Sequence, residues 1–86
     1  MKFIKKPVVI EAIKYQSNLG NNRIINWLAQ QEVNLKDWLF HDGEITIPTL
    51  KGKIKAFDGD WIIKDDEGQF YPYKHDIFVA NYEEVT

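Results

Sequence analysis

Two histidine–aspartate pairs are the residues of this 86-residue chain whose types and spacing could hold a metal ion. His41 is followed by Asp42, and His75 is followed by Asp76. Imidazole nitrogens and carboxylate oxygens are common ligands of divalent metals. Neighbours in sequence point to opposite faces of a strand, however, so each pair would be a poor chelate. We interpret both pairs as polar surface residues at turns, and we predict no metal site.

Nucleophilic and acid–base chemistry finds little support in the residue types. The chain has no cysteine, no glycine-rich phosphate loop and no nucleophile elbow. Its serine and threonine hydroxyls, none with the local context of a catalytic triad, are those of Ser17, Thr46, Thr49 and Thr86. Glu11 could be a catalytic carboxylate, but a charge at a strand edge is the simpler interpretation. We therefore predict no catalytic residue, no cofactor and no enzymatic activity.

Length and composition indicate one small globular domain, residues 1–86. The sequence is 44% hydrophobic and 28% charged, which is ordinary for a folded domain, and its formal charge of −2 gives no positive field that would attract nucleic acid. No apolar run approaches the ~20 residues of a transmembrane helix. The start of the chain is basic, but Pro7 and Glu11 interrupt its apolar run, so we expect no signal peptide. The lack of cysteine fits a reducing cytoplasm.

The N-terminal half predicts one strand and one helix. Residues 8–15 (VVIEAIKY) are apolar on both faces, so we expect the strand to be covered by the helix, by neighbouring strands or by a partner chain. Residues 23–31 place Ile24, Trp27 and Leu28 at positions i, i+3 and i+4, which is typical of an amphipathic helix. The strand and the helix must pack on the second half of the chain.

The C-terminal half alternates turn signals with runs of β-branched and aromatic residues, a pattern typical of short antiparallel strands. Such strands are predicted at residues 44–50, 53–57, 60–64 and 69–73. The run 60–64 is the most apolar and is predicted to be central. Residues 32–42 fit either an irregular link with one helical turn or a short strand. The fold class predicted is α+β: a small, strongly bent antiparallel sheet, or a partly open barrel, with one main helix after the first strand.

The end of the last predicted strand is the candidate partner-binding segment. Tyr71 and Tyr73 share one face of a strand and Phe70 points to the other, so Phe70 is predicted to be core. Lys74 adds a positive charge, and His75 adds a titratable imidazole. Two hypotheses stay open. Either the tyrosines pack under the C-terminal turn, or Tyr71, Tyr73, Lys74 and His75 form a contact surface for a partner.

The aromatic content also permits an oligonucleotide-binding interpretation, because small barrels stack bases on exposed aromatic rings. The aromatic residues on adjacent predicted strands are Trp61, Phe70, Tyr71 and Tyr73. The lysines near them are Lys53, Lys55, Lys64 and Lys74. Five acidic residues stand among these lysines and would repel phosphate. Binding of a nucleotide or single-stranded nucleic acid is therefore the alternative function.

Two stretches of the chain resemble a family of small, largely uncharacterised phage and prophage proteins. The first is KKPVVIEA near the start, and the second is the closing string GQFYPYKHDIFVANYE, preceded by TLKG and GDWII. The resemblance implies a phage-encoded accessory protein and no known activity, cofactor or catalytic residue. The sequence departs from the family pattern at Tyr73, where cysteine is common, and at His75, where proline is common.

These observations favour a non-enzymatic interaction protein that binds a host or phage macromolecule, most simply a protein, and that modulates host defence or metabolism. An aromatic-rich surface suits this function, because tryptophan and tyrosine dominate binding hot spots. A homodimer is expected, since one helix is little cover for the predicted sheet. The expected location is the cytoplasm of an infected or lysogenic bacterium.

Overall fold

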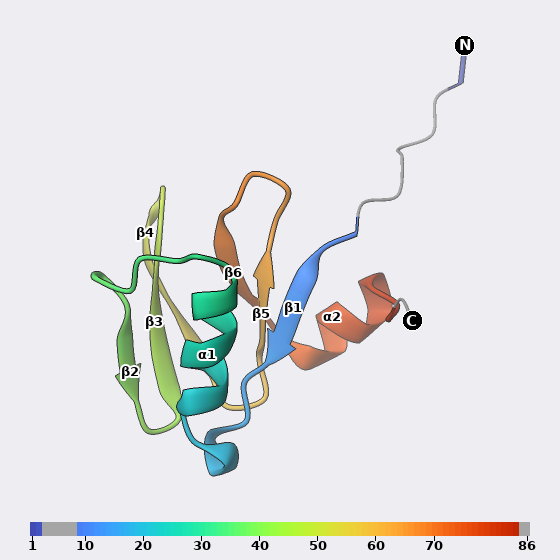
Figure 1. Cartoon of the computed structure of the whole chain (residues 1–86). Helices are drawn as coiled ribbons and strands as arrows, with labels where there is room; N and C mark the ends of the chain where they lie inside the picture. Colours follow the sequence, from blue (N-terminus) through green and yellow to red (C-terminus); the bar gives the residue numbers. More distant parts are fainter. Residues whose placement is uncertain (3–8, 85–86) are drawn as a thin grey trace.

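The computed structural model describes residues 1–2 and 9–84, and these residues contain two three-stranded antiparallel sheets (Figure 1). The first sheet has the order β1 (Glu11–Lys14), β5 (Trp61–Lys64), β6 (Phe70–Tyr73), and the second has the order β2 (Leu39–His41), β3 (Glu44–Thr49), β4 (Gly52–Phe57). The helices are the 3-10 turn η1 (Ser17–Leu19) and the α-helices α1 (Asn22–Gln30) and α2 (His75–Asn81). The predicted α+β class is confirmed. The strands form two sheets, and these sheets do not close into a barrel.

The central position predicted for the most apolar strand is confirmed. Ile62 of β5 lies opposite Ile13 of β1 on one side and opposite Pro72 of β6 on the other. Pro72 lies on an edge strand of this sheet, where a residue without a backbone N–H is tolerated. Alternation along β5 turns Ile62 toward α1 and turns its neighbours to the opposite face.

The second sheet is built from two tight hairpins. Asp42 and Gly43 join β2 to β3, and Gly43 has a φ of 76°, which the predicted Asp-Gly turn requires. Pro48 lies inside β3, the middle strand of this sheet. Because β2 pairs with β3 only as far as Thr46, one side of β3 is locally an edge at Pro48, and the proline is accommodated there.

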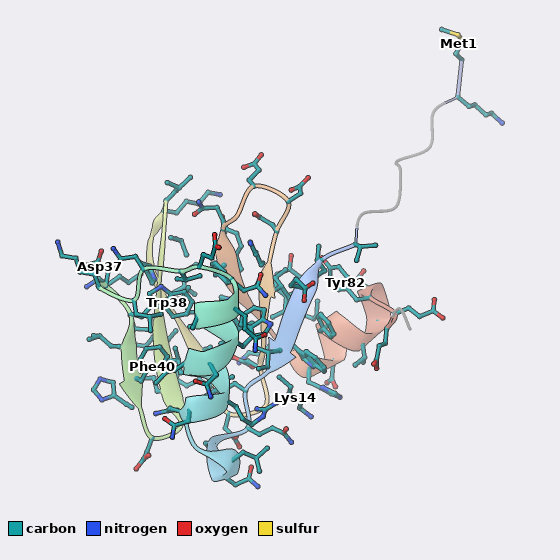
Figure 2. All side chains as sticks on the ribbon, viewed as in Figure 1. Met1, Lys14, Asp37, Trp38, Phe40 and Tyr82 are labelled. Atoms are coloured by element: carbon teal, nitrogen blue, oxygen red, sulfur yellow. The ribbon has the colours of Figure 1, made fainter. Side chains whose placement is uncertain are left out.

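The core lies where α1 meets both sheets. Ile24 and Leu28, at i and i+4 of α1, are fully buried, and Phe70 contacts Trp27 and Trp38 edge to face with ring centroids 5.8 and 5.6 Å apart. Phe70 therefore has the core role predicted for it. The buried cluster contains Tyr15, Ile24, Leu28, Trp38, Ile45, Ile47, Ala56, Ile62 and Phe70. Figure 2 shows Trp38 and Phe40 beside α1, where their rings stack.

Two of the predicted boundaries are wrong by a few residues. The first strand was expected over 8–15, but β1 begins at Glu11; Val9 precedes it with 77% of its surface exposed, and Val8 lies outside the described residues. The helix was expected over 23–31, but α1 ends at Gln30. It ends there because Glu32 has a φ of 59° and the N–H of Val33 returns to the carbonyl of Leu28, which closes a Schellman motif.

Candidate interaction surface

The face of the β1–β5–β6 sheet turned away from α1, called the back face below, carries most of the predicted contact residues. Trp61 lies opposite Tyr73, and Ile63 lies opposite Tyr71. Residues that face one another across antiparallel strands point to the same side, and that side is opposite to Ile62. The two tyrosines and Trp61 are therefore neighbours on one half-buried surface.

Helix α2 covers part of the back face through a stack of aromatic rings. Phe78 lies on Trp61 with ring centroids 4.2 Å apart and an interplanar angle of 14°. Tyr82, one turn later, stacks on Phe78 at 5.0 Å and meets Tyr73 edge to face at 6.2 Å. Phe78 of α2 and Tyr82, the C-cap residue four positions later, thus both face the sheet. Ile77, by contrast, is 53% exposed and does not cover the sheet.

The predicted contact residues also join β6 to α2 and β5. His75 accepts a hydrogen bond at Nδ1 from Nε1 of Trp61, 3.0 Å away. Lys74 is the N-cap residue of α2, and its Nζ lies 3.5 Å from Oδ1 of Asp60 and 5.5 Å from the centre of the Phe57 ring. Lys74 and His75 are nevertheless exposed. Tyr71, Tyr73, Lys74 and His75 therefore lie together, and their contact with a partner stays a prediction.

Asp60 is a structural carboxylate that sequence patterns did not reveal. It is buried, its Oδ2 accepts the backbone N–H of Phe57 at 2.9 Å, and Lys74 supplies the opposite charge. A buried carboxylate needs such partners, because an uncompensated charge is costly to bury. The residues Asp58-Gly59-Asp60 indicate a turn in the sequence. They do not indicate that Lys74, which is distant in sequence, pairs with Asp60 in the fold.

A groove of about 400 Å³ lies between β1 and α2 and is called the β1–α2 groove below. It is lined by residues 9–12, Trp61, Phe78, Tyr82, Glu83 and Glu84. Figure 2 shows Tyr82 beside β1 at the C-terminal end of α2. Glu83 and Glu84 follow the end of α2, and sequence spacing could not show that they would face β1.

The pKa values of Tyr82 and Tyr15, near these surfaces, are raised by their surroundings. Burial raises the pKa of Tyr82 above 10.0, and the neighbouring Tyr73 raises this pKa further. Burial also raises the pKa of Tyr15, whose hydroxyl donates to the carbonyl of His41 at 3.3 Å. Both hydroxyls are therefore neutral hydrogen-bonding groups around pH 7 rather than charged ones.

The aromatic and basic residues of the oligonucleotide hypothesis are divided between different surfaces. Phe70 is buried in the core, while Tyr71 and Tyr73 lie on the back face. Lys53 and Lys55 belong to β4 in the other sheet, and Lys55 is paired with Glu44 at 3.0 Å.

A second hollow, of about 370 Å³, lies at the C-terminal end of α1. There Nζ of Lys64 donates to Oε1 of Gln31 at 3.3 Å, so this lysine is already engaged within the chain. Lys64 lines this hollow together with Phe70, on the side of the sheet opposite to the back face.

Comparison of the chain with protein-family models, with curated proteins and with solved structures gives no significant match. Within residues 1–2 and 9–84, no group of three or more histidine, cysteine, aspartate or glutamate residues is placed to hold a metal ion. The helices of this same part of the chain are too short to cross a membrane.

Proposed function

We propose that this chain is a non-enzymatic accessory protein of phage type that binds a host or phage protein through its back face. The observation that carries the proposal is the clustering of Tyr71, Tyr73, Lys74 and His75 beside the aromatic stack of α2, with both tyrosines only half-buried. Rigid tyrosines next to a basic side chain are typical of binding hot spots. The site of action is the cytoplasm of an infected or lysogenic bacterium, and the outcome is modulation of host defence or metabolism.

The proposal includes a homodimer, and the exposed apolar side chains support it. Val9, Ile77 and Val79 are large apolar residues with more than half of their surface exposed. Sedimentation at micromolar concentration tests this part directly. A dimer is expected, and a single species of 10.1 kDa at all concentrations would contradict it.

The experiment that tests the proposed surface is affinity capture from infected bacterial cells with the immobilised protein and two variants. Tyr71→Thr removes a half-buried ring but keeps a β-branched residue in the strand, and Lys74→Gln removes the charge. The matched controls are Leu39→Thr and Lys53→Gln, both exposed on strands of the other sheet. The melting temperature of each variant shows whether it is folded.

A hot-spot residue contributes more than about 1.4 kcal/mol, so Tyr71→Thr and Lys74→Gln should each retain the partner about tenfold less well or worse. The control variants should capture the partner as well as the wild type does. Equal capture by folded Tyr71→Thr and Lys74→Gln variants would show that the back face does not bind the partner.

A further inference from the structure

Strand β1 presents an open backbone edge. The N–H of Tyr15 donates to the carbonyl of Asp60, and the carbonyl of Tyr15 accepts the N–H of Gly59, both at 2.8 Å, so the peptide groups of Tyr15 face β5. In an antiparallel pair the inward and outward peptide groups alternate, so those of Ala12 and Lys14 point away from β5. Lys14 uses its carbonyl to accept Nη1 of Arg23 at 3.1 Å. Among the described residues, none forms a backbone hydrogen bond with the outward N–H or carbonyl of Ala12.

Helix α2 lies next to this open edge. It crosses from β6 behind the sheet and passes β1 on the side away from β5 (Figure 1), and the two elements share the walls of the β1–α2 groove. Phe78, Tyr82 and Trp61 make the aromatic part of the groove. An extended chain that paired with β1 would point every second side chain toward these rings.

The mouth of the groove is acidic. Glu11, Glu83 and Glu84 line it and are exposed, and the described lining residues include no lysine or arginine. Carboxylates at the rim of a binding surface favour a cationic partner and disfavour an anionic one.

We propose that the β1–α2 groove binds an extended segment of a partner protein, which adds as a fourth strand beside β1. The segment carries apolar residues at alternate positions, which enter the groove, and a lysine or arginine at one end, which lies beside Glu83 and Glu84. Strand addition of this kind takes its affinity from main-chain hydrogen bonds and its specificity from alternate side chains. The binding mode rests on the interaction function proposed above.

A partner of different sequence fits the edge better than a second copy of this chain. Symmetric antiparallel pairing of two copies around Ala12 would also require the carbonyl of Lys14, because the peptide groups of Ala12 and Lys14 both point outward. That carbonyl already accepts Arg23. A foreign strand can instead pair with Ala12 and with the outward peptide groups of Ile10.

The binding test uses two fluorescently labelled seven-residue peptides that alternate valine and threonine, one with a lysine and the other with a glutamate at each end. Fluorescence anisotropy with the full chain measures their affinities. We expect the lysine peptide to bind about tenfold more tightly than the glutamate peptide, or better, because like charges across an interface are penalised. Equal affinity for the two peptides would overturn the assignment of a basic segment.

Two variants test the geometry. Ala12→Pro removes the outward N–H at an edge position where proline is tolerated, so the fold should hold while peptide affinity falls about tenfold. The double variant Glu83→Gln with Glu84→Gln should weaken the lysine peptide by about threefold to tenfold. Its control, Asp66→Asn with Glu67→Gln, makes the same charge change on the β5–β6 turn and should have no such effect.

Peptide affinity that survives Ala12→Pro in a folded protein would overturn strand addition. A dimer that becomes monomeric on Ala12→Pro would instead assign the edge to a second copy of this chain and overturn the partner segment. If Tyr71→Thr abolishes capture of the partner while Ala12→Pro does not, the proposed function stands and this binding mode fails.

Discussion

Nε1 of Trp61 donates a hydrogen bond to Nδ1 of His75, 3.0 Å away, across the junction between β5 and α2. The indole N–H can only donate, so Nδ1 must be the acceptor and the ring proton must lie on Nε2. We expect nitrogen-15 NMR to find His75 in the Nε2–H tautomer. A spectrum that shows the Nδ1–H tautomer would contradict this geometry.

The same pair predicts the effect of removing the acceptor. His75→Phe keeps a ring that can stack on Trp61, whose centroid lies 6.4 Å from that of His75, but it leaves the indole without its partner. We expect a loss of about 1 kcal/mol in the free energy of unfolding, measured by urea denaturation. His41→Phe on exposed β2 is the matched control and should change stability by less than about 0.5 kcal/mol. Equal stability of the two variants would show that the hydrogen bond contributes nothing.

The hydrogen bonding of Asp58 predicts that the stability of the fold depends on pH. Its Oδ1 accepts the N–H of Ser17 at 2.7 Å, and the backbone and side-chain hydrogen bonds from Ser17 hold the pKa of Asp58 below the usual 3.8. A carboxylate whose pKa is lowered by folding stabilises the protein above its unfolded pKa, and this contribution is lost as the pH falls through the folded pKa. Asp58→Asn should therefore be less stable than the wild type at pH 7, and this difference should be smaller at pH 2.

Urea denaturation at both pH values measures this difference. Asp66→Asn, on the exposed β5–β6 turn, is the control and should follow the wild type at both values. A destabilisation by Asp58→Asn of the same size at pH 2 and pH 7 would mean that the ionised carboxylate is not the stabilising species.

The centre of β5 predicts the largest stability effect. Ile62 is fully buried, whereas Leu50 on the β3–β4 turn is 83% exposed. Ile62→Ala should cost about 2–5 kcal/mol because it removes buried methyl groups and leaves a cavity. Leu50→Ala, a similar truncation on the surface, should cost less than about 0.5 kcal/mol. Comparable denaturation midpoints for the two variants would rule out the central position of β5.

Glu32 predicts a stabilising substitution. Its φ of 59° places a residue with a side chain in the left-handed region, at the position after a helix where glycine is usual. Glu32→Gly should raise the free energy of unfolding by about 0.5–1 kcal/mol, because the left-handed strain exceeds the entropy that glycine loses. Glu32→Ala also removes the carboxylate but keeps the strain, so it should give no such gain. A gain of equal size in Glu32→Ala would trace the effect to charge.

The sequence predicted those elements whose signals are local. The apolar run around Ile62 indicated the central strand, alternation placed Phe70 opposite the two tyrosines, and Asp42-Gly43 indicated its hairpin. The division of the strands into two sheets was not predictable, because turns and alternation do not state which distant strands pair. The shorter β1 was missed because the apolar run that begins at Val8 carries no signal for where pairing with β5 begins.

The candidate site was only partly predictable for the same reason. Tyr71, Tyr73, Lys74 and His75 are close in sequence, so strand periodicity found them. Their contacts with Trp61 and Asp60 depend on the docking of α2, which local patterns do not fix. The β1–α2 groove joins residues 9–12 to residues 78–84, and no spacing rule connects segments so far apart.

Hydrogen exchange of the protein with and without its captured partner tests the proposed interaction surface most directly. Binding through the back face and the β1–α2 groove should slow exchange in residues 9–14 and 71–82, because a partner there excludes water and pairs the open edge of β1. The β2–β3–β4 sheet should exchange as it does in the free protein. Protection confined to that second sheet, with residues 9–14 and 71–82 unchanged, would contradict the proposed interaction surface.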